Sequence, residues 1–244
     1  MIIEMLYPEL SNLYGDSANI KYLKDSFPEI EIIETNIGER PTFLNKGKVD
    51  LIYRGTMTER GQQLFIDNAS MYVDEMKDAI EQGQRFLVTG NAVEVFGKYI
   101  IDKTGEKIDC LKVFNYHTER DIIAKRFNSL YVGMYNDIKI VGFKSQFGHS
   151  FYDDEIEPLF DTIRGPGFNT KETREGIHYK NFMGTYLLGP LLILNPDFTI
   201  DFANEIGMSE FKPAFYDTAK AAYEMRLKQY TDDKTGFYYY YIKS

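Results

Sequence analysis

A doubly wound α/β fold with a mostly parallel sheet is the fold class that the sequence predicts. Over the first 100 residues, short apolar runs rich in β-branched side chains alternate with longer stretches of helical periodicity, which is typical of parallel strands with crossover helices. Glycine-containing turns lie between these runs at residues 15–16, 55–57 and 90–91. Ligands bind at the carboxyl ends of such strands, and we expect the three turns to share that edge.

The amino-terminal elements follow from apolar spacing. The runs that predict strands are residues 2–7, 29–35, 49–53 and 85–88. Asp16 or Ser17 is expected to cap a helix that continues to residue 24. A second helix is expected from about residue 62 to residue 82, because its apolar positions recur with helical spacing.

The later sequence has shorter elements. A hairpin is expected over residues 98–113 with its turn at 103–105, and short strands are expected at residues 130–132, 138–143 and 177–187. Residues 164–167 are expected to form a loop.

An amphipathic helix is expected within residues 208–230, begun at Pro213, with an apolar face made of Phe215, Ala219, Ala222 and Tyr223. The tyrosine-rich run at residues 237–242 is interpreted as a strand or contact surface, or as a tail packed on its own domain. No linker or repeat interrupts the chain, so a single domain over residues 1–244 is predicted, with the helix and tail from about residue 208.

Composition excludes several classes of function. The net charge of −9 and a pI near 5.0 argue against nucleic-acid or anionic-membrane partners, which need a basic face. A single cysteine, Cys110, allows no intramolecular disulfide and argues against a cysteine-based zinc site, and the three histidines have no metal-ligand spacing. No signal peptide or membrane span is visible, so we expect a cytoplasmic protein that needs no metal or cofactor.

Residues 85–97 have the form of a nucleophile elbow. An apolar strand leads into the turn Thr89-Gly90-Asn91-Ala92, and a helix-like run follows. In acyl-transfer enzymes the tip of this turn carries serine or cysteine at a helix N-terminus. The tip here is Gly90, which has no side chain that could attack a substrate.

Several strings in the expected order over residues 1–190 resemble class I (triad) glutamine amidotransferases. The similarity is to the cobyric-acid-synthase-like branch and, within it, to the glutaminase subunits of lipid II isoglutaminyl synthases. The strings that carry it are residues 13–20, 50–62, 87–97, 141–148 and 175–187. The resemblance implies a flavodoxin-like fold and a glutaminase that docks on an ATP-dependent, Mur-ligase-like amide ligase and supplies it with ammonia.

This chain departs from the family pattern at the site of the chemistry. The family cysteine falls on Gly90 and the family histidine falls on Leu188. The glycine pair that lines the oxyanion and glutamine pocket falls on Thr56 and Met57, and a position that often holds histidine has Gln146. Without a nucleophile a base has no use, so the joint loss predicts a glutaminase fold without glutaminase activity.

The residues expected to line the ligand cleft are Gly55, Thr56, Met57, Asn91, Glu94 and Gln146. Glu94 stands where relatives carry glutamine and is interpreted as an acidic residue in the first turn of a helix, with ligand binding as the alternative. Cys110 is interpreted as a buried structural thiol rather than a displaced nucleophile. His149 is expected near the entrance of the cleft. The acidic run at residues 153–157 is interpreted as a solvated surface rather than a cation site.

Three functions stay open on the sequence alone. The first is a non-catalytic subunit that docks on an amide ligase of cell-wall or cobyric-acid type. The second is a sensor that binds glutamine or another amino acid without turnover. The third is an enzyme of different chemistry that uses carboxylates, Gln146 or a tyrosine in the same cleft. The sequence does not specify the pathway, the partner or the oligomeric state.

Overall fold

A six-stranded sheet forms the centre of the protein in a computed structural model, which describes residues 1–11, 13–123, 126–208, 212–236 and 238–239. All strands of the sheet are parallel except β13, which pairs antiparallel with β14. The strand order is β13 (Ile177–Tyr179), β14 (Phe182–Thr185), β4 (Arg85–Thr89), β3 (Leu51–Arg54), β1 (Ile2–Leu6) and β2 (Glu31–Thr35). The predicted doubly wound α/β fold is confirmed.

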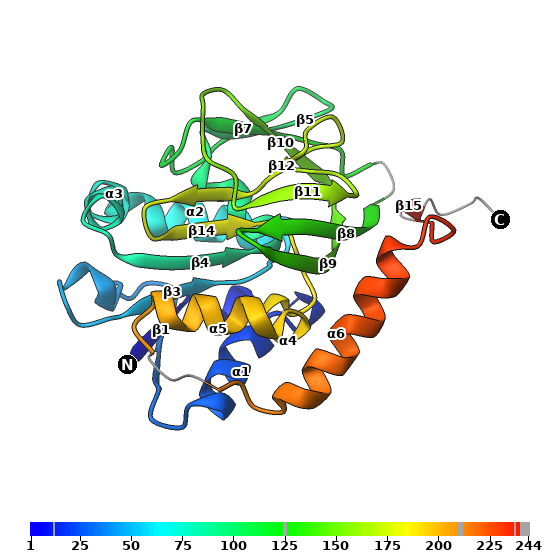
Figure 1. The fold of residues 1–244 in the computed structure, drawn as a ribbon. Coiled ribbons are helices and arrows are strands. Elements are labelled where there is room, and N and C mark those ends of the chain that lie inside the picture. Colours follow the sequence, from blue (N-terminus) through cyan, green and yellow to red (C-terminus); the bar gives the residue numbers. More distant parts are fainter. Residues whose placement is uncertain (12, 124–125, 209–211, 237, 240–244) are drawn as a thin grey trace.

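Two smaller sheets pack beside the central one (Figure 1). The first has the order β10 (Gly148–Tyr152), β7 (Tyr116–Arg120), β5 (Tyr99–Asp102) and β6 (Lys107–Asp109). The second has the order β12 (Arg174–Glu175), β11 (Phe160–Arg164), β8 (Phe127–Tyr135) and β15 (Tyr238–Tyr239), and β9 (Ile138–Gln146) also pairs with β8. The predicted hairpin over residues 98–113 is present as β5 and β6, while β7, β10 and β11 were not predicted.

Helices cover both faces of the central sheet. The α-helices are α1 (Ala18–Ser26), α2 (Glu59–Ala69), α3 (Val73–Glu81), α4 (Leu191–Leu194), α5 (Pro196–Glu205) and α6 (Tyr216–Thr231). One hydrophobic cluster joins α2 and α3 to the sheet, and a second joins α1, α4 and α5 to the opposite face (Figure 1). Among the described residues, none of these helices has the length and apolar character needed to cross a bilayer.

Three helix predictions need correction. The single helix expected over residues 62–82 begins earlier, at Glu59, where Thr58 caps it, and a 3₁₀ turn over Ser70–Tyr72 divides it into α2 and α3. The run after the elbow is a 3₁₀ helix over Gly90–Phe96 rather than an α-helix. Helices α4 and α5 occupy residues for which no helix was expected.

The carboxyl-terminal helix also differs from its prediction. It begins at Tyr216, and of the four residues expected on its apolar face only Tyr223 is buried, whereas Phe215 is 76% exposed. Tyr238 and Tyr239 form β15 against β8, which agrees with the strand interpretation of the tyrosine-rich run. The other residues of that run, 237 and 240–242, lie outside the described part of the chain.

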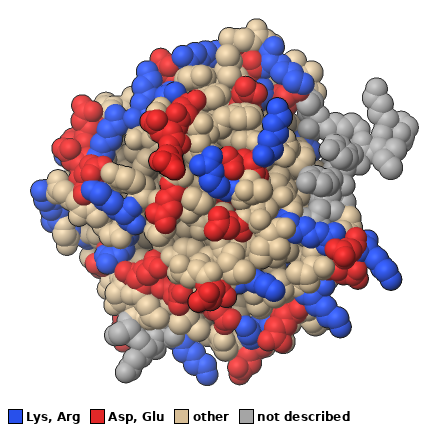
Figure 2. Space-filling view, turned by 45° about the horizontal axis from the view of Figure 1, so that its top comes forward, with Lys and Arg blue, Asp and Glu red and all other residues tan. Residues whose placement is uncertain are grey.

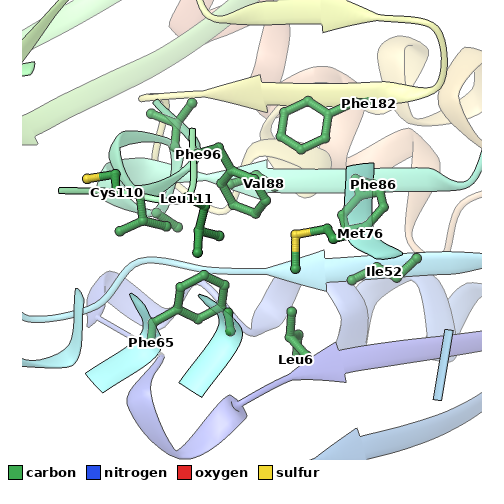
Figure 3. Close-up of a cluster of buried hydrophobic side chains, with 14 of the residues drawn as sticks. Leu6, Ile52, Phe65, Met76, Phe86, Val88, Phe96, Cys110, Leu111 and Phe182 are labelled. Atoms are coloured by element: carbon green, nitrogen blue, oxygen red, sulfur yellow. The ribbon is translucent and has the colours of Figure 1, made fainter. Parts of the chain in front are cut away.

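Cys110 lies in the apolar cluster beneath the elbow, where Figure 3 places it beside Leu111. Its side chain is 7% exposed, and burial raises the pKa of its thiol to about 12. A thiol with so high a pKa is a poor nucleophile at neutral pH, because the thiolate is the reactive form. The interpretation of Cys110 as a structural residue is consistent with this environment.

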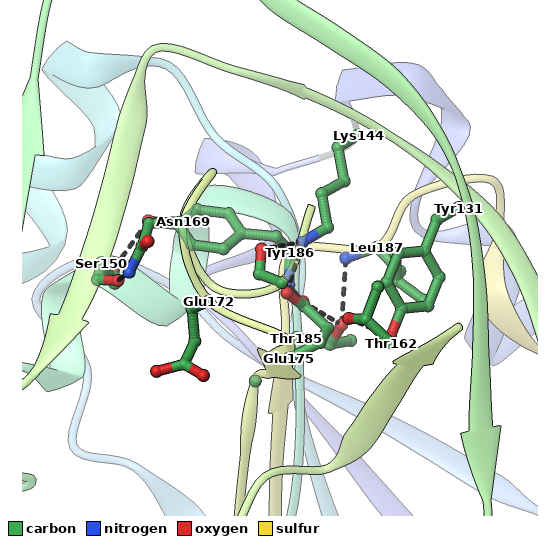
Figure 4. Close-up of polar contacts among 12 residues, drawn as sticks. Tyr131, Lys144, Ser150, Thr162, Asn169, Glu172, Glu175, Thr185, Tyr186 and Leu187 are labelled. Carbon is green, nitrogen blue, oxygen red and sulfur yellow. Dashed lines mark hydrogen bonds and ion pairs between the residues drawn. The ribbon is translucent and has the colours of Figure 1, made fainter. Parts of the chain in front are cut away.

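A buried ion pair lies within the second small sheet, and hydrogen bonds link it to the central sheet. Lys144 of β9 and Glu175 of β12 are both fully buried and in direct contact (Figure 4). Glu175 also accepts hydrogen bonds from the hydroxyl of Thr185, the last residue of β14, at 2.9 Å and from the Tyr186 amide at 2.8 Å. Burial lowers the pKa of Lys144, and the neighbouring Glu175 carboxylate opposes that shift. The pair therefore holds β9, β12 and the end of β14 together.

Replacing one member of this pair should destabilise the protein strongly. Lys144→Met leaves the Glu175 carboxylate buried without its cation, and we expect the free energy of unfolding to fall by about 3–5 kcal/mol. Lys180→Met is the matched control, because it removes an exposed lysine from its pair with Glu81, and solvent-exposed pairs contribute little to stability. Urea unfolding measures both variants, and equal losses would contradict the clamp role.

Candidate functional site

The elbow backbone is intact at the carboxyl end of β4. Thr89 is extended, and Gly90 has a φ of +62°, the left-handed conformation that glycine accepts without strain. A Cβ atom added at Gly90 would clash with the Thr56 hydroxyl and come within 2.9 Å of a Leu188 methyl carbon. The space into which a nucleophile would project is therefore filled by two neighbouring side chains.

A buried carboxylate holds Thr56 in this position. Asp16 is 1% exposed, and one of its oxygens accepts hydrogen bonds from the Thr56 amide, the Thr56 hydroxyl and the Thr89 hydroxyl, each at 2.7 Å. Its other oxygen accepts from the Asn19 side chain at 3.1 Å. Burial raises the pKa of Asp16, while the bonds from the threonines lower it. Asp16 was expected as a possible helix cap, but its side chain instead joins the ends of β3 and β4.

Asn91 and Met57 bind each other across the turn. The Met57 amide donates to the Asn91 side-chain oxygen at 3.0 Å, and the Asn91 side-chain nitrogen donates to the Met57 carbonyl at 2.8 Å. Because the Thr56 amide is bound to Asp16, both amides of this loop already have acceptors inside the protein. Neither is free to stabilise an anion in a neighbouring ligand.

Glu94 does not lie in the first turn of the helix after the elbow, which holds no acidic residue, so that interpretation was wrong. It lies instead in a buried polar network. Its carboxylate accepts hydrogen bonds from Gln62 at 2.8 Å and from the Tyr186 hydroxyl at 3.1 Å, and Arg120 donates to Gln62 at 3.0 Å. The pKa of Glu94 is raised to about 7, chiefly by burial, and the hydrogen bond from Gln62 opposes this shift. Gly148 permits this packing, because a Cβ there would clash with the carboxylate.

A small cavity remains among these residues. Its volume is about 10 Å³, and of the six residues predicted for the cleft its lining includes Thr56, Met57, Asn91, Glu94 and Gln146. Gly55, the sixth, lies outside this lining, beside Asp16. Arg120 and Arg126 also line the cavity. The sequence missed Arg120 because the buried positions of β7, which carries it, include the polar residues Thr118 and Arg120, so the strand has no alternating apolar pattern.

The histidines lie outside the lining of this cavity. His149 is partly buried on β10, and burial lowers its pKa to about 4. His117 pairs with Asp153 at 3.0 Å, and Asp153 also binds Lys98 at 2.8 Å, so the acidic run is partly neutralised by basic neighbours. In the part of the chain that the structure describes, no cluster of three histidine, cysteine or acidic side chains could hold a metal ion.

The amino-acid sequence matches the model of a known protein family. The model of the CobB/CobQ-like glutamine amidotransferase domain matches residues 2–195. The chain belongs to this family. The resemblance found in the sequence is thereby confirmed, and α6 lies beyond the matched segment.

Two curated relatives carry the same name. Subunit GatD of the glutamine-hydrolyzing lipid II isoglutaminyl synthase of Staphylococcus aureus (strain N315) is 29% identical over 232 residues, which cover 92% of each chain. Subunit GatD of Streptococcus pneumoniae (strain ATCC BAA-255 / R6) is 27% identical over 203 residues, which cover 79% of this chain and 75% of that one.

A solved structure of a glutamine amidotransferase supports the fold. It covers 85% of this chain and 100% of its own length, with a TM-score of 0.52 at 15% identity.

On the face of the molecule shown in Figure 2, acidic and basic side chains are interspersed, without the broad basic surface that a nucleic acid would need.

Glu94 should make stability depend on pH. Its pKa is raised from 4.5 in the unfolded chain to about 7 in the folded protein, so folding binds a proton between these values. The contribution of Glu94 to the free energy of unfolding is therefore greatest below pH 4.5 and falls by roughly 3 kcal/mol as the pH rises to 7 and above. Glu94→Gln should remove this part of the dependence. Urea unfolding from pH 4.5 to 8 tests it, and parallel curves for both proteins would contradict the assignment.

Proposed function

We propose that this chain is a glutamine amidotransferase-like subunit without glutaminase activity, which docks on an ATP-dependent amide ligase. The observation that carries the proposal is the filled space at Gly90. Glutaminases of this type attack the substrate with a side chain at that position. Gly90 has no such side chain, and the neighbouring residues leave no room for one.

The hydrogen-bond donors of the neighbouring loop support the same conclusion. Acyl transfer needs preorganised donors aimed at the oxygen that becomes negatively charged. The resemblance puts this role at residues 56 and 57, but the Thr56 amide is bound to Asp16 and the Met57 amide to Asn91. An oxyanion would have to break one of these bonds before it could bind.

The base position supports it as well. Leu188 stands where the resemblance places histidine, is 1% exposed and has no group that exchanges protons. Its amide donates to the Phe143 carbonyl at 3.0 Å, so its backbone is held against β9. A proton acceptor for a thiol is therefore missing from the side of the elbow where the family has one.

The size of the cavity favours this function over amino-acid sensing. A volume of about 10 Å³ is close to that of a single water position and far below that of glutamine. A sensor would have to open the cleft by moving Thr56 and the residues that line it, and the hydrogen bonds of Asp16 and Asn91 oppose that movement.

The partner follows from the relatives. Both are named as subunits of a lipid II isoglutaminyl synthase, so we infer a Mur-ligase-like amide ligase of the cell-wall type, with a cobyric-acid-type ligase as the broader family alternative. With no ammonia released from glutamine by this subunit, the ligase would use free ammonia or another amine.

The native protein should release no ammonia from glutamine above background. The double variant Gly90→Cys with Leu188→His should also stay at background, because a Cβ at residue 90 clashes with the Thr56 hydroxyl. Adding Thr56→Gly should remove this clash and allow an alkylating reagent to label the thiol.

A coupled ammonia assay and mass spectrometry measure these outcomes. Turnover by the native protein would overturn the proposal. Robust turnover by the double variant would show instead that only two residues block an otherwise intact pocket. The matched control is Gly38→Cys, which places a thiol at an exposed glycine with open space around it.

The docking role predicts a stable complex with a ligase. The full-length tagged chain, isolated from its native cells, should co-purify with an ATP-dependent ligase of the Mur type, identified by mass spectrometry. Recovery of the chain alone in repeated preparations would contradict the docking role and leave the glutaminase result unaffected.

A further inference from the structure

Helix α6 presents a solvent-exposed face that its own domain does not use. Of its 16 residues, all of which the structure describes, only Tyr223 is buried. On the opposite side Met225 is 76% exposed, which is among the highest values for a large apolar side chain in the described part of the chain. Figure 1 shows α6 running along the outside of the molecule. An amphipathic helix normally buries a full stripe of side chains, so the outer face of α6 is available to another protein.

Polar contacts at both ends fix the orientation of this helix. At its amino-terminal end Asp197 of α5 accepts hydrogen bonds from the Tyr216 hydroxyl at 2.8 Å and from the Lys220 ammonium at 2.5 Å. At its carboxyl-terminal end Arg164 of β11 donates to the carbonyl of Tyr230 at 2.7 Å. Because both ends are held, α6 presents one defined face to solvent.

The exposed face has the spacing of a helix-packing surface. Thr218, Ala221, Ala222 and Met225 stand at positions i, i+3, i+4 and i+7, and all four are exposed. Four residues with this spacing surround the hole into which one side chain of a neighbouring helix inserts. Three of them are small, which leaves the hole open, and Met225 is long and flexible enough to fill such a hole. The same surface therefore carries both a hole and the side chain that fits it.

We propose that this face binds a second copy of the chain, with the two α6 helices antiparallel about a two-fold axis near Ala222. The charges beside the hole select this occupant. Asp217 lies in the first turn of α6 and Lys228 in the last, and both are exposed. They are separated by about three full turns, so they share one side of the helix. The two-fold axis brings Asp217 of each copy beside Lys228 of the other, which gives two attractive pairs.

A parallel arrangement of the two helices is disfavoured. It would place Asp217 beside Asp217 and Lys228 beside Lys228 of the other copy, and it would align the partial charges of the helix ends unfavourably. The surface also lies beyond residues 2–195, the segment that the family model matches. The proposal therefore depends neither on the glutaminase assay nor on docking to a ligase.

Sedimentation velocity of the full chain over a range of concentrations tests the proposal. The native protein should shift toward the mass of a dimer as its concentration rises. Met225→Lys places a charge in the centre of the contact and should keep the protein monomeric at the same concentrations. Met71→Lys is the matched control, because Met71 is a methionine of similar exposure in the 3₁₀ turn between α2 and α3. A native protein that stays monomeric throughout, or equal effects of the two variants, would overturn the proposal.

Charge reversal tests the pairing. Asp217→Lys should raise the dissociation constant of the dimer roughly tenfold, because two attractive pairs become repulsive. Adding Lys228→Asp should restore the native dissociation constant, since the pairs are then reversed in sign and attractive again. Failure of the second substitution to restore association would contradict the proposed contact.

Cysteine cross-linking tests the orientation. Ala222→Cys places a thiol near the axis in both copies, and mild oxidation should join them as a covalent dimer, whereas the native Cys110 is buried. Thr231→Cys, at the exposed end of α6, is the control. It should give no covalent dimer, because antiparallel helices hold its two copies roughly 25 Å apart along the helix axis. Equal cross-linking at both positions would indicate a parallel pair and overturn the proposal.

Discussion

The buried carboxylate of Asp16 is the interaction on which the functional edge of this protein depends. Removing a carboxylate from water is costly unless hydrogen bonds replace its hydration. Here the donors come from the turn after β3, from the end of β4 and from α1, through Thr56, Thr89 and Asn19. Asn19 in turn accepts from the Leu192 amide at 2.9 Å, which extends the network to α4. One charge thus fixes the relative positions of elements that are distant in the sequence.

The hydrogen bonds of Asp16 also determine what residue 90 can be. The left-handed turn keeps the backbone form of an elbow, and the Asp16 network keeps the Thr56 hydroxyl in the space beside it. A larger residue at position 90 would have to displace a hydroxyl that is bound at 2.7 Å to a buried charge. The absence of a nucleophile is therefore a property of the surrounding network as well as of a single residue, and one substitution does not reverse it.

The central strands could be predicted from the sequence because their apolar runs are continuous and their turns contain glycine. The break between α2 and α3 could not, because apolar residues keep helical spacing through Ser70–Tyr72. Helix α5 was missed for a similar reason, since its first turn follows Asn195-Pro196 directly after another short helix. The local spacing of apolar residues is a poor predictor of helix bounds when tertiary packing determines where a helix begins.

The sequence predicts which residues lie near the elbow, but it does not predict which of them are buried. Family strings place Thr56, Met57 and Asn91 near the elbow, and five of the six predicted cleft residues line one cavity. Glu94 was misread as an acidic residue in the first turn of a helix because it follows the elbow closely in the sequence. Its burial comes from β7, β10 and Tyr186, which are distant in sequence. A charged group enters the interior only when several separate elements each supply a donor. That condition is visible in the fold and absent from any short stretch of sequence.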